Sequence, residues 1–185
     1  MEQKTGILLK SSFTSGVYLG LISILLSVLI WAGGIIESMG LFGAAIIGLI
    51  SLIISFVLLI IFAKVYRNKE FGGYISFGEA FKFTFLVIII STTISIIYSY
   101  IFNSFIAPEY MENLMAVMQQ KTMNYMESAG VPESQIDKAM EKFGEIPTIW
   151  ETLKQTALSG LIGGGIIALI ASAIVKKKEN SEVPE

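Results

Sequence analysis

Hydrophobic residues in this chain are gathered into four long stretches that contain no charged side chain. Only Glu37 separates the first stretch from the second. A bilayer core about 30 Å thick is crossed by roughly 20 helical residues. Backbone groups in lipid must be satisfied internally, and no stretch has the alternating pattern of a barrel strand. We therefore predict four membrane-spanning helices, at about 13–36, 40–63, 83–106 and 155–175.

The composition places the chain among membrane proteins. Hydrophobic residues make up 54% and charged residues 15% of the sequence, whereas about 25% charged residues is usual in a soluble protein. The mean hydropathy is +0.70. Cysteine and histidine are absent, which excludes disulfides, thiolate nucleophiles and the commonest general base. No charged residue lies inside a predicted span, although such residues usually mark proton relays or substrate sites. We therefore expect no enzyme, no catalytic residues, no cofactor and no metal.

Basic residues are distributed unequally between the two sides of the predicted spans. Nine of them precede the first span, occupy the loop between spans two and three, or directly follow span four, whereas the turn at about 37–40 has none and the segment 108–154 has four. Since Lys and Arg favour cytoplasmic loops, we predict that both termini are cytoplasmic. The first span is longer than the apolar region of a signal peptide, which favours an uncleaved helix over cleavage near Ala32. A net charge of −2 gives no basic field for nucleic acid.

The segment 108–150, between spans three and four, is predicted to be a helical hairpin outside the cytoplasm. We expect one helix over 109–128 and a second from Pro132 to about Phe143, closed by Gly144 and Pro147. Most of the methionines in the chain lie here. Thioethers can bind copper(I), but no Cys or His is present to complete such a site. We therefore interpret the methionines as an adaptable packing or partner surface.

Small residues recur at four-residue spacing within the spans, which lets helix backbones approach one another closely. The predicted helix-packing residues are Gly16, Gly20, Gly160 and Gly164. Serines recur in the same way over 91–99 of span three. The glycines at 163–165 suit either close packing or a broken helix beside a transport site, and the absence of charged partners favours packing.

The loop before span three, "FGGYISFGEAFKFTF", predicts a turn followed by a helix start. Gly72 and Gly73 suit a tight turn with positive φ. Ser76 and Glu79 have the spacing of a capping box, with Ser76 as N-cap. Lys82 lies three residues after Glu79 on the same helix face. A phosphate-binding loop would need a longer glycine pattern followed by Lys and Ser or Thr, which is absent.

The same loop resembles the signature of the domain of unknown function 4199 family of small four-span bacterial membrane proteins. The matching positions are Gly73, Ser76, Gly78, Glu79, Phe81 and Lys82. The stretches "MEQKT", "APEYMENLMAVMQQ" and "GVPESQIDKAMEKF" and the glycine-rich last span are also similar to this family. The resemblance implies a bacterial cytoplasmic membrane protein with four helices, and no established activity.

Two functions are consistent with these observations. The first is a non-enzymatic scaffold or interaction protein, whose partners would be the bilayer and either a second copy of the chain or another membrane protein. The alternative is a small transporter or channel subunit for a neutral or apolar solute, suggested by the glycine cluster and the serine stripe. The fold expected in both cases is an all-α membrane four-helix bundle with a helical hairpin between spans three and four.

Overall fold

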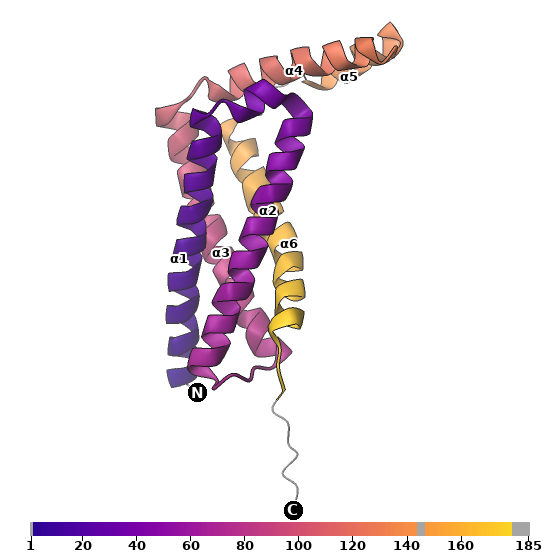
Figure 1. Ribbon diagram of the computed structural model, residues 1–185. Helices are drawn as coiled ribbons and strands as arrows, with labels where there is room; N and C mark the ends of the chain where they lie inside the picture. The colour runs from indigo at the N-terminus through magenta and orange to yellow at the C-terminus, as the bar shows by residue number, and fades with distance from the viewer. Residues whose placement is uncertain (1, 144–146, 179–185) are drawn as a thin grey trace, which may run out of the picture.

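The computed structural model, which describes residues 2–143 and 147–178, is an all-α protein (Figure 1). Four long helices form a bundle, and two shorter helices lie across one end of it. We call this the α4 end, and the opposite end, where α1 begins and α6 finishes, the terminal end. In chain order the elements are α1 (Glu2–Ala32), α2 (Ile35–Glu70), α3 (Phe77–Ile101), the π-helix η1 (Phe102–Ile106), α4 (Tyr110–Ser128), α5 (Glu133–Phe143) and α6 (Ile149–Val175).

Four helices are long and apolar enough to cross a membrane, as the sequence predicts. They run through Gln3–Ala32, Phe42–Glu70, Phe77–Ile106 and Ile149–Val175. The last of them begins six residues before the predicted limit at 155, because Thr148 and Glu151 form a second capping box. Glu151 and Lys154 interrupt the uncharged stretch, so a search for charge-free residues misses this first turn.

The turn between the first two spans differs from the prediction at 37–40. The chain reverses at Gly33 and Gly34, where Gly34 has φ 55°, and Glu37 already lies in the first turn of α2. A second break follows at Gly40, whose φ of 68° and ψ of −155° interrupt the helix. Only glycine adopts both conformations without strain. The first span therefore ends at Ala32 and not at 36.

Helices α4 and α5 occupy the segment predicted to be a helical insertion. Both extend sideways past the bundle (Figure 1), and the chain turns between them at Gly130, with φ 72°. No residue of α4 is buried, whereas Ile136 of α5 is only 7% exposed. The predicted second helix begins at Glu133, directly after Pro132. Of its two predicted closing residues, Gly144 lies outside the described residues, and Pro147 directly precedes Thr148, the N-cap of α6.

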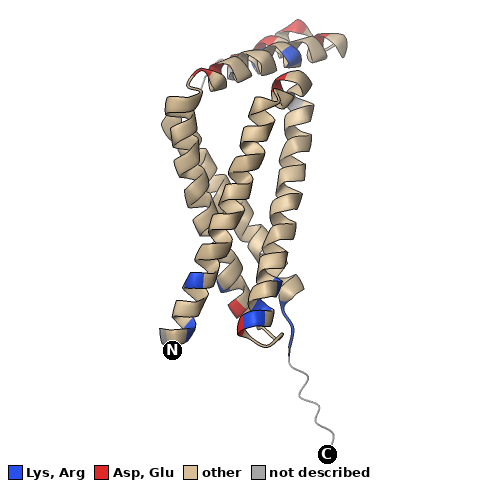
Figure 2. Cartoon of the chain, turned by 60° about the vertical axis from the view of Figure 1, so that its left-hand side comes forward, with Lys and Arg blue, Asp and Glu red and all other residues tan. Residues whose placement is uncertain are grey.

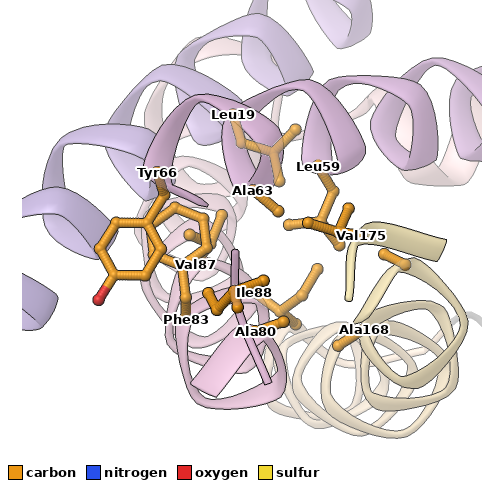
Figure 3. Packing of buried hydrophobic residues seen from close by; sticks show 12 residues of the cluster. Leu19, Leu59, Ala63, Tyr66, Ala80, Phe83, Val87, Ile88, Ala168 and Val175 are labelled. Carbon is orange, nitrogen blue, oxygen red and sulfur yellow. The ribbon is translucent and has the colours of Figure 1, made fainter. Parts of the chain in front are cut away.

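The close-packed core lies in the half of the bundle near the terminal end (Figure 3). Its largest fully buried side chain is Phe83 of α3, and the ring of Tyr66 stacks on Phe83 with centroids 4.2 Å apart. The other core residues come from the middle of α1, the last third of α2, the loop before α3 at Ile75, the first half of α3 and the last third of α6. Burial of these side chains holds all four helices together at this end.

The predicted packing glycines lie where α1 and α6 meet α3. A Cβ at Gly16 would lie 2.7 Å from Cβ of Ile90, and one at Gly20 would lie 3.0 Å from Cβ of Ile94. On the other side of α3, a Cβ at Gly160 would lie 2.7 Å from Cγ2 of Thr92, and one at Gly164 would overlap Ile88. Helix α3 therefore packs closely between a glycine face of α1 and a glycine face of α6. Helix α2 has no such face, since a Cβ at Gly48 would meet nothing within 4 Å.

Candidate functional site

The loop at the terminal end has the local structure that its sequence predicts. Gly72 and Gly73 have φ values of 59° and 96°, so the chain turns there with positive φ. Ser76 is the N-cap of α3 and its hydroxyl accepts a hydrogen bond from the Glu79 backbone N–H at 3.3 Å. The Glu79 carboxylate accepts from the Ser76 N–H at 3.2 Å and from its hydroxyl at 2.7 Å. Two backbone donors that helix geometry leaves free are thus satisfied.

This loop is also fastened to the end of α6, which the sequence does not reveal. Ile75 and Lys177 exchange two backbone hydrogen bonds, each 3.0 Å long, as a single antiparallel bridge. Arg67 of α2 donates from Nη1 to the carbonyl of Val175 at 3.0 Å, where α6 ends. A cation at a helix C-terminus is favourable because the last carbonyls are unsatisfied. We call these contacts between Arg67, Ile75, Val175 and Lys177 the terminal clasp.

The charged pair that the sequence places after the capping box is not an ion pair. Glu79 and Lys82 are both among the described residues, and neither a hydrogen bond nor an ion pair joins them, because the Glu79 carboxylate is engaged by Ser76. Lys82 is exposed. Gly78 is also exposed, and a Cβ there would meet nothing within 4 Å. Phe81 stacks between Phe77 and Phe85, with centroids 6.3 and 5.4 Å apart.

A polar contact inside the packed half joins α3 to α6. The hydroxyl oxygens of Thr84 and Ser172 lie 2.9 Å apart, and both residues are 0% exposed. Each hydroxyl also reaches a carbonyl of its own helix, Thr84 that of Ala80 at 3.0 Å and Ser172 that of Ala168 at 2.6 Å. Both hydroxyls thus have hydrogen-bond partners within the protein, and we assign the pair to helix packing.

The half of the bundle near the α4 end is less closely packed, and its cavities are partly open to the outside. Three adjoining cavities of about 260, 360 and 290 Å³ lie there, and Ser23 of α1 lines all three. The middle one is bounded by all four spanning helices and reaches the glycine cluster at 163–165 through Gly163 and Gly164. We call the three together the hydroxyl-lined cavity, because Ser and Thr are its commonest polar residues. No charged residue lines any of the three.

The looser packing of this half follows from how the helices approach one another. Helices α1 and α6 approach α3 through their glycines, whereas α2 is held mainly at the terminal end by Leu59, Ala63 and Tyr66. Beyond Leu59, towards the α4 end, α2 contributes no residue to the buried core. The space between α2 and the other three helices is therefore only partly filled by side chains, and the middle cavity opens there to the outside. The serine stripe of α3 faces this space at Ser91 and Ser95.

Aromatic side chains line the cavity at the α4 end. Phe102, in the π-helix, is 7% exposed and contacts Trp31 and Tyr110 edge-to-face, with centroids 5.3 and 5.7 Å away. Burial, together with the nearby carboxylate of Glu37, raises the pKa of Tyr110 above its usual value near 10. Tyr110 opens α4, so the segment after span three borders the cavity.

Within residues 2–143 and 147–178, no cluster of three or more His, Cys, Asp or Glu side chains could hold a metal ion. The sequence-predicted residues fall into two separate places. Positions 72–82 form the loop at the terminal end, and the four packing glycines lie along α3. In the sequence, the serine stripe and the glycine cluster at 163–165 were the indications of this cavity. Its other walls depend on how the helices are rotated.

Comparison with known proteins gives one match. The family model described as Protein of unknown function (DUF4199) matches residues 14–177, nearly the whole chain. No curated protein and no solved structure shows a significant match.

Proposed function

Because the chain belongs to the DUF4199 family of proteins of unknown function, we propose its function from its own geometry: a non-enzymatic scaffold or interaction protein. The observation that supports it is the arm formed by α4 and α5. This arm extends past the bundle (Figure 1), and α4 has no buried residue. The packing glycines are already used between α1, α3 and α6, which leaves the arm as the surface for a second copy or another membrane protein.

The proposed location is the bacterial cytoplasmic membrane, with both termini in the cytoplasm and the arm outside. Figure 2 supports this orientation, because most Lys and Arg residues gather at the terminal end, whereas Asp and Glu predominate on α4 and α5. Positive residues are retained on the cytoplasmic side during insertion. Fusions of a reporter that is active only outside the cytoplasm are expected to be active at residue 130 and inactive at the C-terminus. The reverse pattern would contradict the orientation.

Photocrosslinking in native membranes tests the scaffold. A photoreactive residue at Gln120, exposed on α4, is expected to give a discrete protein adduct. The same residue at Leu49, which is 60% exposed on α2, is the control and is expected to react with lipid alone. Mass spectrometry of the adduct then separates a second copy from a different protein. If both positions give only lipid adducts, the scaffold is rejected.

A second candidate function, a small transporter or channel subunit for a neutral or apolar solute, is favoured by the hydroxyl-lined cavity. Ligand sites in helical membrane proteins lie between helices, near the middle of the bilayer. Four helices contribute to this cavity, and its uncharged walls suit an uncharged solute. Solute flux into proteoliposomes containing the purified protein, compared with empty liposomes, tests this candidate.

A further inference from the structure

We propose that the hydroxyl-lined cavity binds a small uncharged molecule with several hydroxyl groups, of the polyol class. This inference rests on the second candidate function and names its ligand and the residues that hold it. It commits to a polar ligand, whereas the cavity volume alone would also admit an apolar one.

An unpartnered hydroxyl on a buried residue is the first reason. Ser91 is only 7% exposed and lines the middle cavity. A serine inside a spanning helix ordinarily donates to the carbonyl four residues earlier, as Ser23 does to Leu19 at 2.9 Å and Ser55 to Ser51 at 2.8 Å. Ser91 makes no hydrogen bond to any residue that the structure describes. Its donor is thus free at the wall of the cavity.

Further free donors lie on the same wall and on the facing helix. The hydroxyl of Tyr98 is buried and has no hydrogen-bond partner among the described residues, and Tyr98 borders the part of the cavity near the α4 end. Ser95 of α3 and Ser51 of α2 line the middle cavity, and neither side chain has a hydrogen bond within the described chain. The Tyr98 hydroxyl is buried, so leaving it without a partner is costly, whereas Ser95 and Ser51 are half-buried. A ligand that accepts from several of these groups is therefore favoured.

The cavity also offers acceptors. The hydroxyls of Ser23 and Ser55 each donate their proton to a carbonyl of their own helix, so their oxygens can accept a hydrogen bond from a ligand. Asn103 donates from Nδ2 to the carbonyl of Ser99 at 2.8 Å, which leaves its carbonyl oxygen as an acceptor. A hydroxyl group both donates and accepts, so a polyol matches this mixture. A charged ligand would find no counter-charge in the cavity and would lose its hydration.

Apolar residues complete the match with a polyol. Leu19, Ile88 and Ile167 lie among the hydroxyls of the middle cavity, where they can contact the C–H faces of a short carbon chain. A purely apolar ligand would fit these residues but would leave the hydroxyls of Ser91 and Ser95 without partners. The walls therefore favour an uncharged molecule that is polar along its length.

Because the chain has no cysteine, single cysteines can report on occupancy. The full chain carrying Ser91→Cys, and separately Ser51→Cys on the opposite wall, is placed in lipid nanodiscs and treated with the small neutral reagent methyl methanethiosulfonate. We expect both thiols to react, and erythritol to slow the reaction. At roughly nine times the dissociation constant of erythritol, the rate is expected to be about tenfold lower.

Matched controls separate binding from general effects. Sucrose at the same osmolarity controls for effects of the solvent and is expected to protect less than erythritol, because it is the bulkier molecule. Ser172→Cys, in the packed half and 0% exposed, is expected to stay unlabelled with or without erythritol. Adding Ser95→Ala to either cysteine variant is expected to weaken protection by erythritol while leaving the rate without erythritol unchanged.

Three results would overturn the proposal. Labelling of both thiols without protection means that the cavity holds water only. Failure of both thiols to react means that lipid or side chains fill it. Equal protection by sucrose means that the polyol acts through the solvent. Erythritol flux in proteoliposomes is measured separately: protection without flux retains the binding site and rejects the transporter, so the two ideas fail in different ways.

Discussion

Thr84 of α3 and Ser172 of α6 share a hydrogen bond of 2.9 Å between their hydroxyl oxygens, in the packed half of the bundle. The Thr84 hydroxyl also lies 3.4 Å from the carbonyl of Ala168, and among the described residues these polar contacts join two helices that otherwise meet there through apolar side chains and glycine faces. In lipid the hydrophobic effect does not drive helices together, so packing and such hydrogen bonds carry the association. The contact lies within the close-packed core rather than in the hydroxyl-lined cavity, so its energy can be measured without disturbing that cavity.

We predict that a double-mutant cycle between Thr84→Val and Ser172→Ala gives a modest coupling energy. Interhelical hydrogen bonds in membranes contribute about 0.6 kcal/mol on average. The coupling is expected to be small because each hydroxyl still reaches a carbonyl of its own helix when its partner is removed. The free energy of unfolding is measured in mixed detergent micelles for the four proteins of the cycle.

Thr93→Val provides the control for this cycle. Thr93 is exposed and donates only to the carbonyl of Ile89, at 2.9 Å. Its coupling to Ser172→Ala should be close to zero. An equal coupling for Thr93 and Thr84 would mean that the value reports on hydroxyl loss in general and not on the contact between α3 and α6.

The membrane spans and the capping box that begins α3 could be predicted from the sequence, because both depend on residues that are close together in the chain. Crossing a bilayer requires a long apolar helix, and a capping box such as that of Ser76 and Glu79 involves residues only three apart. The contact between Thr84 and Ser172 could not be predicted, since it joins positions 88 residues apart. It depends on the rotation of each helix, which the even apolarity of the spans does not specify.

The start of α6 and the terminal clasp show two further limits. Thr148 and Glu151 carry the same capping signal as the start of α3, and a search for capping boxes in addition to apolar stretches would have found it. The terminal clasp could not be predicted from the sequence. Arg67 is equally consistent with an ordinary basic residue of a cytoplasmic loop, and its contact with Val175 becomes visible only in the structure. The less closely packed half of the bundle results from the position of α2, which no local pattern determines.

We predict that Gly164→Ala destabilises the bundle whereas Gly163→Ala does not. A Cβ at Gly164 would overlap Cγ2 of Ile88, and a β-branched side chain cannot move aside cheaply. Overpacking of this kind costs about 1–3 kcal/mol. A Cβ at Gly163 would meet nothing within 4 Å, and alanine is the better helix former. Both free energies of unfolding are compared with that of the unchanged protein.

Suppression by a second substitution makes this test specific. Ile88→Ala removes the atom that the new methyl group would strike, so Gly164→Ala should cost less in that background than in the original one. If Gly163→Ala is as destabilising as Gly164→Ala, the glycines act through helix propensity or a bend in α6, and close packing against α3 is not their role.

For the N-cap of α3, we predict that Ser76→Ala costs about 1 kcal/mol. The substitution removes both the acceptor for the Glu79 N–H and the hydroxyl that binds the Glu79 carboxylate. Glu79→Gln is the control, because glutamine can still accept from the Ser76 N–H and should cost less. Hydrogen exchange in the first turn of α3 gives the local free energy. Equal protection in the serine and alanine proteins would mean that the clasp alone fixes this turn.

The last prediction concerns the terminal clasp. Arg67→Met removes the donor that binds the carbonyl of Val175 but keeps a long side chain at the same position. The end of α6 should then open more often, so the amides of Lys176 and Lys177, which donate to Ser172 and Ile75, should exchange faster. A loss of about 1 kcal/mol corresponds to roughly fivefold faster exchange.

Lys64→Met is the matched control, because Lys64 lies on the same helix, is exposed and binds no described residue. Faster exchange in both variants would assign the effect to lost charge at this end of the bundle, whereas faster exchange in Arg67→Met alone would assign it to the hydrogen bond that joins α2 to α6.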